Sequence, residues 1–227
     1  MAYIQTRHVD VGGLLSGTFA ELARIPRALA IYLAVVFAAA LIADLDEVAM
    51  AIIATLAIIA YFPGQYYLYR AALSDSGLMV ESNLKVFGFA AIGLILIWPI
   101  MIGLNFFYIP GLLLAAKWVM APSFFAAENR TFYDAMSDSW NASRDNLLHL
   151  SLAFGILVIV WSVGFVFVVM LSTNFNIGSL MGREAASGLG ALGWVYMHLL
   201  PIVLMGLSVT AYRSLAEPDD SLVSVFE

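Results

Sequence analysis

Apolar residues in this chain gather into six stretches, each long enough for a membrane-spanning helix. About 20 apolar residues, with roughly 17 to 25 workable, cross the hydrocarbon core of a bilayer as a helix. The chain has 227 residues, of which 63% are hydrophobic and only 11% charged, whereas soluble domains carry about 25% charged residues. The sequence therefore predicts an all-α polytopic membrane protein with six transmembrane helices. The predicted spans are residues 28–44, 48–68, 87–107, 111–127, 147–171 and 191–212.

Shorter amphipathic segments precede the paired spans. In residues 131–146, Thr131 is placed to cap a helix, with Asp134 three residues on, as in a variant capping box. Such segments fit helices that lie in the cytoplasmic interface with an apolar face in the acyl boundary. The chain is then one integral membrane domain, residues 1–227: interfacial helix 9–25, hairpin 28–72, a weaker interfacial segment 75–85, hairpin 87–127, interfacial helix 131–146, hairpin 147–213 and acidic cytoplasmic tail 214–227.

This arrangement suggests a threefold repeat of an interfacial helix followed by a hairpin. Short pairs of residues recur at matching places: Thr18-Phe19 with Ser139-Trp140, and Tyr69-Arg70 with Tyr212-Arg213. A proline also falls in the second helix of each hairpin, at Pro63, Pro122 and Pro201. Coincidences of this size are common in so apolar a chain, so the repeat and its absence both stay open.

Basic residues set the expected orientation. Eight of them lie in the termini and the loops on one side, and Arg183 alone lies in a loop on the other. Because cytoplasmic loops carry the excess of Lys and Arg, both termini are expected in the cytoplasm. The formal net charge of −6 argues against nucleic acid as a partner. The chain has no cysteine, which excludes disulfides and cysteine metal sites.

Lys117 is the sharpest candidate for function, because a charge inside an apolar run is costly in lipid and indicates a partner or a cavity. One interpretation is structural: the lysine reaches the outer interface or pairs with Asp44, Asp46 or Glu47. The other makes it a counter-ion for a lipid phosphate or an anionic substrate in an outward-facing cavity. Both interpretations remain open from the sequence.

Aromatic and polar residues in two spans allow similar alternatives. Tyr61, Tyr66, Tyr67 and Tyr69 cluster around Pro63 and Gly64, as in an aromatic belt at the interface, which is the commoner case. The alternative is a kinked helix lining a groove through which lipid enters. His198 fits either a proton relay or, more simply, a donor to a backbone carbonyl.

The stretch 109–150 resembles the membrane domain that accompanies bacterial glycerophosphoryl diester phosphodiesterases, and the related YciC-like inner-membrane proteins. The residues that carry this are Pro110-Gly111, Lys117-Trp118, Pro122, Glu128, Ala135 and Ser139-Trp140. The family usually has arginine where Lys117 stands, so a planar, bidentate role is in doubt here. The resemblance implies a polytopic protein of the bacterial inner membrane. It does not imply phosphodiesterase activity, which belongs to a separate soluble domain.

No pair of an acid and a base falls within the predicted spans, and no metal site, cofactor or enzyme activity is expected. The sequence favours a non-enzymatic protein of membrane lipid organisation or envelope homeostasis. The expected partners are membrane lipids, with other membrane proteins or a second copy of this chain as further candidates. The alternative is a transporter or lipid-translocating component with an anionic-ligand site at Lys117. The candidate lipid contacts are Lys117, Trp118, Trp140, Arg70 and Arg213, and the candidate structural motif is Pro110, Gly111, Pro122, Glu128 and Ser139.

Overall fold

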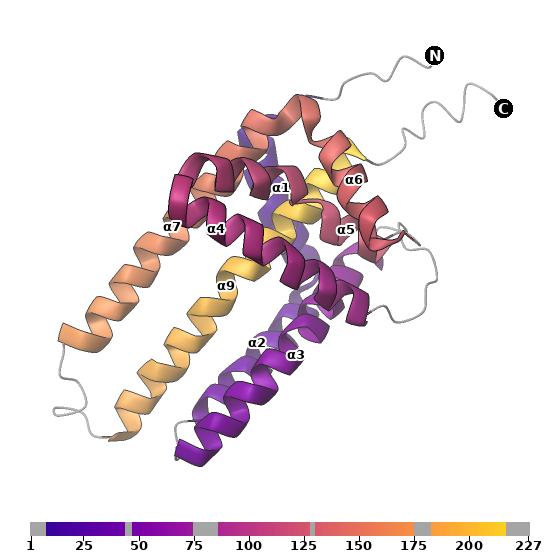
Figure 1. The fold of residues 1–227 in the computed structure, drawn as a ribbon. Coiled ribbons are helices and arrows are strands. Elements are labelled where there is room, and N and C mark those ends of the chain that lie inside the picture. Colours follow the sequence, from indigo (N-terminus) through magenta and orange to yellow (C-terminus); the bar gives the residue numbers. More distant parts are fainter. Residues whose placement is uncertain (1–7, 44–46, 75–85, 128–129, 175–182, 217–227) are drawn as a thin grey trace, which may run out of the picture.

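The computed structural model describes residues 8–43, 47–74, 86–127, 130–174 and 183–216, and every regular element in these ranges is helical (Figure 1). The all-α prediction is thus confirmed. The elements are α1 (Val11–Arg24), α2 (Pro26–Ala43), α3 (Glu47–Ser74), α4 (Val86–Trp118), α5 (Ala121–Ala127), α6 (Phe132–Ala142), the short 3-10 helix η1 (Arg144–Asn146), α7 (Leu147–Asn174) and α9 (Arg183–Leu215).

Three helical stretches in the described residues are long and apolar enough to cross a membrane: Tyr108–Ala127, Arg144–Met170 and Leu192–Leu215. A fourth is counted if α1 and α2 form one broken span, since the two helices meet at an angle of 81°. These helices are consistent with a membrane protein.

The boundary between α1 and α2 follows from local sequence. Asp10 caps α1 by accepting a hydrogen bond from the backbone N–H of Gly13 at 2.7 Å. α1 stops at Ile25 because the residue before a proline is disfavoured in the helical region, and Pro26 then opens α2, where its missing N–H costs nothing. The predicted segment 9–25 is therefore a helix of its own.

α4 folds back on itself. A Cβ placed on Gly103 would lie 2.6 Å from the Cα of Gly111, although residues eight apart in a straight helix are separated by about 12 Å. The two arms are visible in Figure 1, where they run across the direction of the α2–α3 and α7–α9 pairs. Gly103 and Gly111 allow this reversal because neither residue carries a side chain at the contact.

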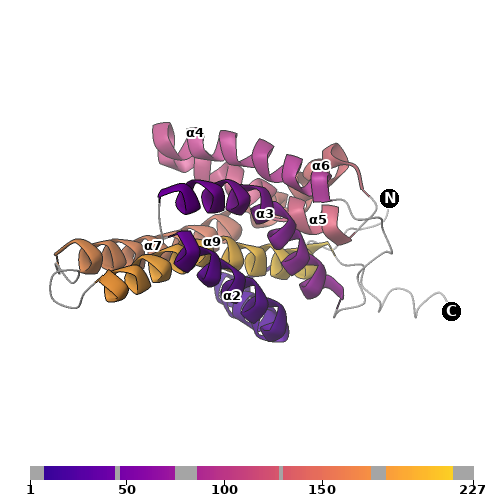
Figure 2. The same ribbon diagram turned by 90° about the horizontal axis from the view of Figure 1, so that it is seen from below.

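α9 is the helix against which most others pack. Its residues 202–212 are largely buried, with Met205, Leu207 and Val209 at most 1% exposed, whereas Leu192 and Met197 nearer its start are 55% and 48% exposed. We call the end of the molecule at Tyr212 the packed end and the opposite end the open end. Figure 2, seen from below, shows α4 on one side of α9 and α2 on the other.

Small residues let α1 lie directly on α9. The buried face of α1 consists of Leu14, Thr18 and Glu21, and a Cβ on Gly206 of α9 would lie 2.8 Å from the backbone oxygen of Thr18. Nearer the open end, α7 and α9 are joined by a reciprocal pair of hydrogen bonds. Trp161 Nε1 donates to the carbonyl of Tyr196 at 3.1 Å, and the Tyr196 hydroxyl donates to the carbonyl of Trp161 at 2.8 Å.

Two glycines of α9 give a matched test of this packing. We expect Gly206→Ala to lower the free energy of unfolding by about 1–3 kcal/mol, because the nearest atom to the added methyl group, at 2.8 Å, is the backbone oxygen of Thr18, which cannot swing aside as the end of a flexible side chain can. Gly193→Ala is the control: nothing lies within 4 Å of a Cβ there, and alanine stabilises a helix interior by about 1 kcal/mol over glycine. Thermal unfolding of both variants in detergent should shift in opposite directions. Equal shifts would contradict the close contact of α1 with α9.

The capping box predicted for α6 is present. The Thr131 hydroxyl accepts from the backbone N–H of Asp134 at 3.3 Å, and the Asp134 carboxylate accepts from the backbone N–H of Thr131 at 3.3 Å. The carboxylate also accepts from the Thr131 hydroxyl at 2.6 Å. These hydrogen bonds to the charged form, the side-chain one first, hold the pKa of Asp134 below its ordinary value.

The lowered pKa of Asp134 makes the stability of the folded protein depend on pH. Because the folded protein favours the ionised carboxylate, the stabilisation is complete above the ordinary pKa and is lost as the pH falls through the lowered folded pKa. We expect wild type to be more stable than Asp134→Asn at neutral pH, and the difference to vanish in acid, where the protonated acid resembles the amide. Thermal midpoints measured over a pH series test this, and a difference independent of pH would rule out the charged cap.

Candidate functional site

The break between α4 and α5 organises the central motif. Pro122 has no N–H and its ring clashes with the carbonyl one turn earlier, so the helix is interrupted by a turn at residues 119–120. The carbonyl oxygen of Lys117 accepts hydrogen bonds from two hydroxyls of the following segment, Ser139 Oγ at 2.8 Å and Ser143 Oγ at 3.4 Å. Both serines are fully buried. Ser139 and Ser143 thus connect α6 to the end of α4.

The side chain of Lys117 turns to the same helix, α6. Its Nζ donates to the carbonyl of Trp140 at 3.3 Å and lies 4.9 Å from the centre of the Trp140 ring. Trp140 is in the last turn of α6, where free carbonyls concentrate negative charge and attract a cation. The Trp118 and Trp140 rings pack with their centres 6.0 Å apart. We refer to Lys117, Trp118, Ser139, Trp140 and Ser143 as the Lys117 cluster.

The contacts of Lys117 can be compared with the two interpretations that the sequence left open for it. Lys117 is 9% exposed, and its ammonium group is directed to the carbonyl and the ring of Trp140 in α6. Asp44 and Asp46, two of its expected partners, lie outside the described residues, and the same is true of Glu128 from the motif. Lys117, Trp118, Ser139 and Trp140 were singled out from the sequence as members of one motif, and the structure brings them into contact together with Ser143, which the sequence did not indicate as a partner.

Substitutions in the Lys117 cluster should act on stability. We expect Ser139→Ala to cost about 1 kcal/mol, the typical net value of one hydrogen bond. Lys117→Met should cost about 1–2 kcal/mol through loss of the contacts with the helix end and the ring. Thermal unfolding measures both. If Lys117→Met leaves stability unchanged, the structural role of the ammonium group is excluded.

Arg213, predicted as a lipid contact, is engaged inside the protein. Its Nη2 lies 3.1 Å from Glu21 Oε2 and donates to the carbonyl of Ala72 at 2.9 Å. The side chains of Arg213 and Glu21 are 16% and 7% exposed. The ion pair therefore ties α1, α3 and α9 together at the packed end. Sequence reasoning missed Glu21, although its spacing from Leu14 and Thr18 places all three on one helix face.

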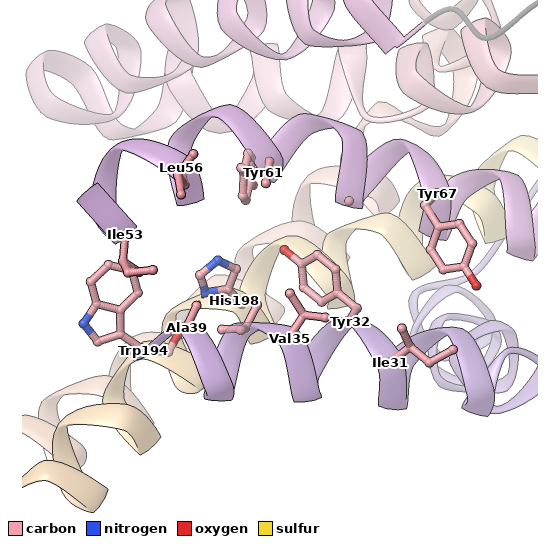
Figure 3. Close-up of a pocket in the computed structure, with 13 residues that line it drawn as sticks. Ile31, Tyr32, Val35, Ala39, Ile53, Leu56, Tyr61, Tyr67, Trp194 and His198 are labelled. Atoms are coloured by element: carbon pink, nitrogen blue, oxygen red, sulfur yellow. Dashed lines mark hydrogen bonds between the residues drawn. The ribbon is translucent and has the colours of Figure 1, made fainter. Parts of the chain in front are cut away.

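An apolar cleft opens between α2, α3 and α9, with a volume of about 350 Å³ (Figure 3). This volume is within the range of small-molecule sites, about 300–1,000 Å³. The cleft is lined by Ile31, Tyr32, Val35, Val36, Ala39, Ile53, Leu56, Ala60, Tyr61, Gly64, Tyr67, Trp194 and His198. Three members of the tyrosine-rich stretch, Tyr61, Gly64 and Tyr67, thus face a groove, the less common of the two interpretations. Lys117 is not among the lining residues.

The rings of Tyr32, Tyr61 and His198 lie close together in the cleft and carry polar atoms. The Tyr32 hydroxyl accepts a hydrogen bond from Gln65 Nε2 at 3.1 Å, and the His198 ring lies 5.9 Å from the Tyr32 ring and 6.1 Å from the Tyr61 ring. His198 Nδ1 is 2.9 Å from the carbonyl of Trp194. Because a carbonyl can only accept, Nδ1 carries the proton, and His198 is a donor to backbone as the simpler interpretation held.

Within the described ranges, no three His, Asp or Glu side chains gather as metal ligands would. Comparison with protein families, with characterised proteins and with solved structures finds no match for this chain. The resemblance of residues 109–150 to the phosphodiesterase-associated membrane domain therefore stays a prediction.

Proposed function

We propose that this chain is a non-enzymatic protein of the bacterial inner membrane that acts on membrane lipid organisation by holding lipid in the cleft between α2, α3 and α9. The observation that carries the proposal is the lining of the cleft, which is aliphatic and aromatic apart from three tyrosine hydroxyls, one indole N–H and one imidazole. A cleft of this kind in the hydrocarbon core is in contact with acyl chains at high concentration. An acyl chain that fills the cleft makes dispersion contacts with the lining side chains, and these contacts are absent when the cleft is empty.

The proposed topology has six spans with both termini in the cytoplasm. The α2–α3 hairpin, the folded-back α4 and the α7–α9 pair correspond to the three hairpins. Thr18 and Ser139 are both fully buried while their neighbours Phe19 and Trp140 are 57% and 42% exposed, which supports equivalent places in a repeat. Tyr69 and Tyr212, the other matched pair, are likewise both buried.

The alternative, a transporter or lipid-translocating component with an anionic ligand at Lys117, has less support. Such a site requires a cavity that reaches the ammonium group. The cleft is lined by other residues, and the ammonium group already contacts the carbonyl and the ring of Trp140. The Lys117 cluster fits a structural contact between α4 and α6 better than a ligand site.

Filling the cleft tests the proposal. Ala39 lines the cleft, whereas the adjacent Ala38 is exposed and outside it. We expect Ala39→Phe to weaken lipid binding about tenfold or more, because the ring displaces at least two methylene groups of the acyl chain at about 0.8 kcal/mol each. Ala38→Phe should bind as wild type does. Native mass spectrometry of detergent-purified protein titrated with phospholipid gives both affinities.

Two results would overturn the proposal. The first is a wild-type protein that retains no phospholipid under conditions that preserve its fold. The second is equal lipid binding by the Ala39→Phe and Ala38→Phe variants, since lipid would then bind elsewhere on the surface.

A further inference from the structure

A second cavity, of about 490 Å³, also lies along α3 and is lined by Pro63, Tyr66, Tyr67, Arg70, Ala71, Ser74 and Val86. Tyr67 lines both this cavity and the cleft. Along α3, positions 53, 56, 60, 64, 67, 71 and 74 recur at helical spacing and form one face. This face runs from the apolar cleft to Ala71 and Ser74, which line the second cavity together with Arg70.

A second arginine lies at the same level on α2. The hydrogen bond between Tyr32 and Gln65 fixes the pairing of the antiparallel helices α2 and α3. Five residues further toward the packed end on each helix are Arg27 and Arg70. Arg27 also comes one turn before Ile31, and Arg70 one turn after Tyr67. Ile31 and Tyr67 lie together at one mouth of the cleft in Figure 3.

Neither arginine is paired with an acid in the described part of the chain. The Arg70 guanidinium lies 5.9 Å from the centre of the Tyr66 ring, and Arg27 is exposed. Both therefore keep N–H donors for a ligand, and guanidinium groups match phosphate oxygens in geometry and charge. Two cations facing one phosphodiester leave an excess of positive charge. This favours a headgroup with net negative charge over a zwitterionic one, whose own ammonium group would be repelled.

The length of the cleft also fits a lipid. From Ile53 to Tyr67, α3 rises about 21 Å at about 1.5 Å per residue. One leaflet of hydrocarbon is half of the roughly 30 Å core, about 15 Å. An acyl chain of one leaflet can therefore lie in the cleft while its phosphate remains at the mouth.

We propose that the cleft binds an anionic phospholipid, with one acyl chain against α2, α3 and α9 and the phosphate held by Arg70 and Arg27. This inference rests on the proposed function, because it names the class of lipid that the cleft takes. It places the headgroup at the packed end, which the distribution of basic residues predicts to be cytoplasmic. The shared Tyr67 then lies between the acyl chain and the phosphate.

The test compares two phospholipids with identical acyl chains, one anionic (phosphatidylglycerol) and one zwitterionic (phosphatidylethanolamine), titrated in native mass spectrometry. We expect wild type to prefer the anionic lipid, and Arg70→Gln and Arg27→Gln each to weaken its binding about tenfold, as loss of a charge-assisted contact does. Arg70→Lys should retain part of the preference. Arg144→Gln, which makes the same charge change away from both cavities, should leave it unchanged.

The outcomes separate this inference from the proposed function. If both lipids bind equally and Arg70→Gln changes neither, the phosphate site is overturned while lipid binding in the cleft stands. If neither lipid binds to wild type, the proposed function fails as well. Inorganic phosphate should not displace the lipid at equal concentration; if it does, the site takes free phosphate and the acyl chain contributes nothing. Thermal unfolding of each variant confirms that binding is measured on folded protein.

Discussion

The packing of the C-terminal half of α9 against its neighbours holds the rest of the structure in place. Polar side chains connect α9 to other helices there: Arg213 to Glu21 of α1 and to the backbone of α3, and Ser208 to Ser123 of α5 at 2.7 Å. A polar group left without a partner in an apolar environment costs several kcal/mol. These contacts therefore fix which helices meet at the packed end, and Gly206 allows α1 to approach closely enough to take part.

Among the described residues of the open end, polar contacts between the helix pairs are fewer. α7 and α9 remain joined by Trp161 and Tyr196, but α2 and α3 meet α9 there across an apolar cleft. In a membrane such a space costs little, because acyl chains are as apolar as the side chains that line it. The cleft is thus a consequence of packing that is tight at one end and loose at the other, and lipid is the occupant that its chemistry suits.

Lys117 illustrates how a charge inside an apolar run can serve the fold. Its ammonium group lies at the C-terminal end of α6, and its carbonyl receives the hydroxyls of Ser139 and Ser143. The same residue therefore anchors α6 through both its side chain and its backbone, next to the break made by Pro122. Arg70 contrasts with it, since it is a basic residue that lines a cavity and that no acid of the described residues neutralises.

The sequence by itself predicted an all-α chain, helices apolar enough to cross a membrane and several helix ends. Asp10, Pro26 and Thr131 act within three or four residues of their own positions, so the start of α1, the break before α2 and the cap of α6 could be predicted from local physics. Lys117, Trp118, Ser139 and Trp140 were recognised in the sequence as members of one motif, but their contacts with one another were not predicted.

Tertiary structure alone decided the contacts between distant parts: Arg213 and Ala72 are 141 residues apart and Tyr32 and Gln65 are 33 apart. Partners so distant are chosen by how whole helices pack, because apolar spans offer many faces of similar hydrophobicity and no local signal to distinguish them. For that reason the ion pair of Glu21, the partner of Lys117 and the cleft between α2, α3 and α9 emerged only from the folded chain.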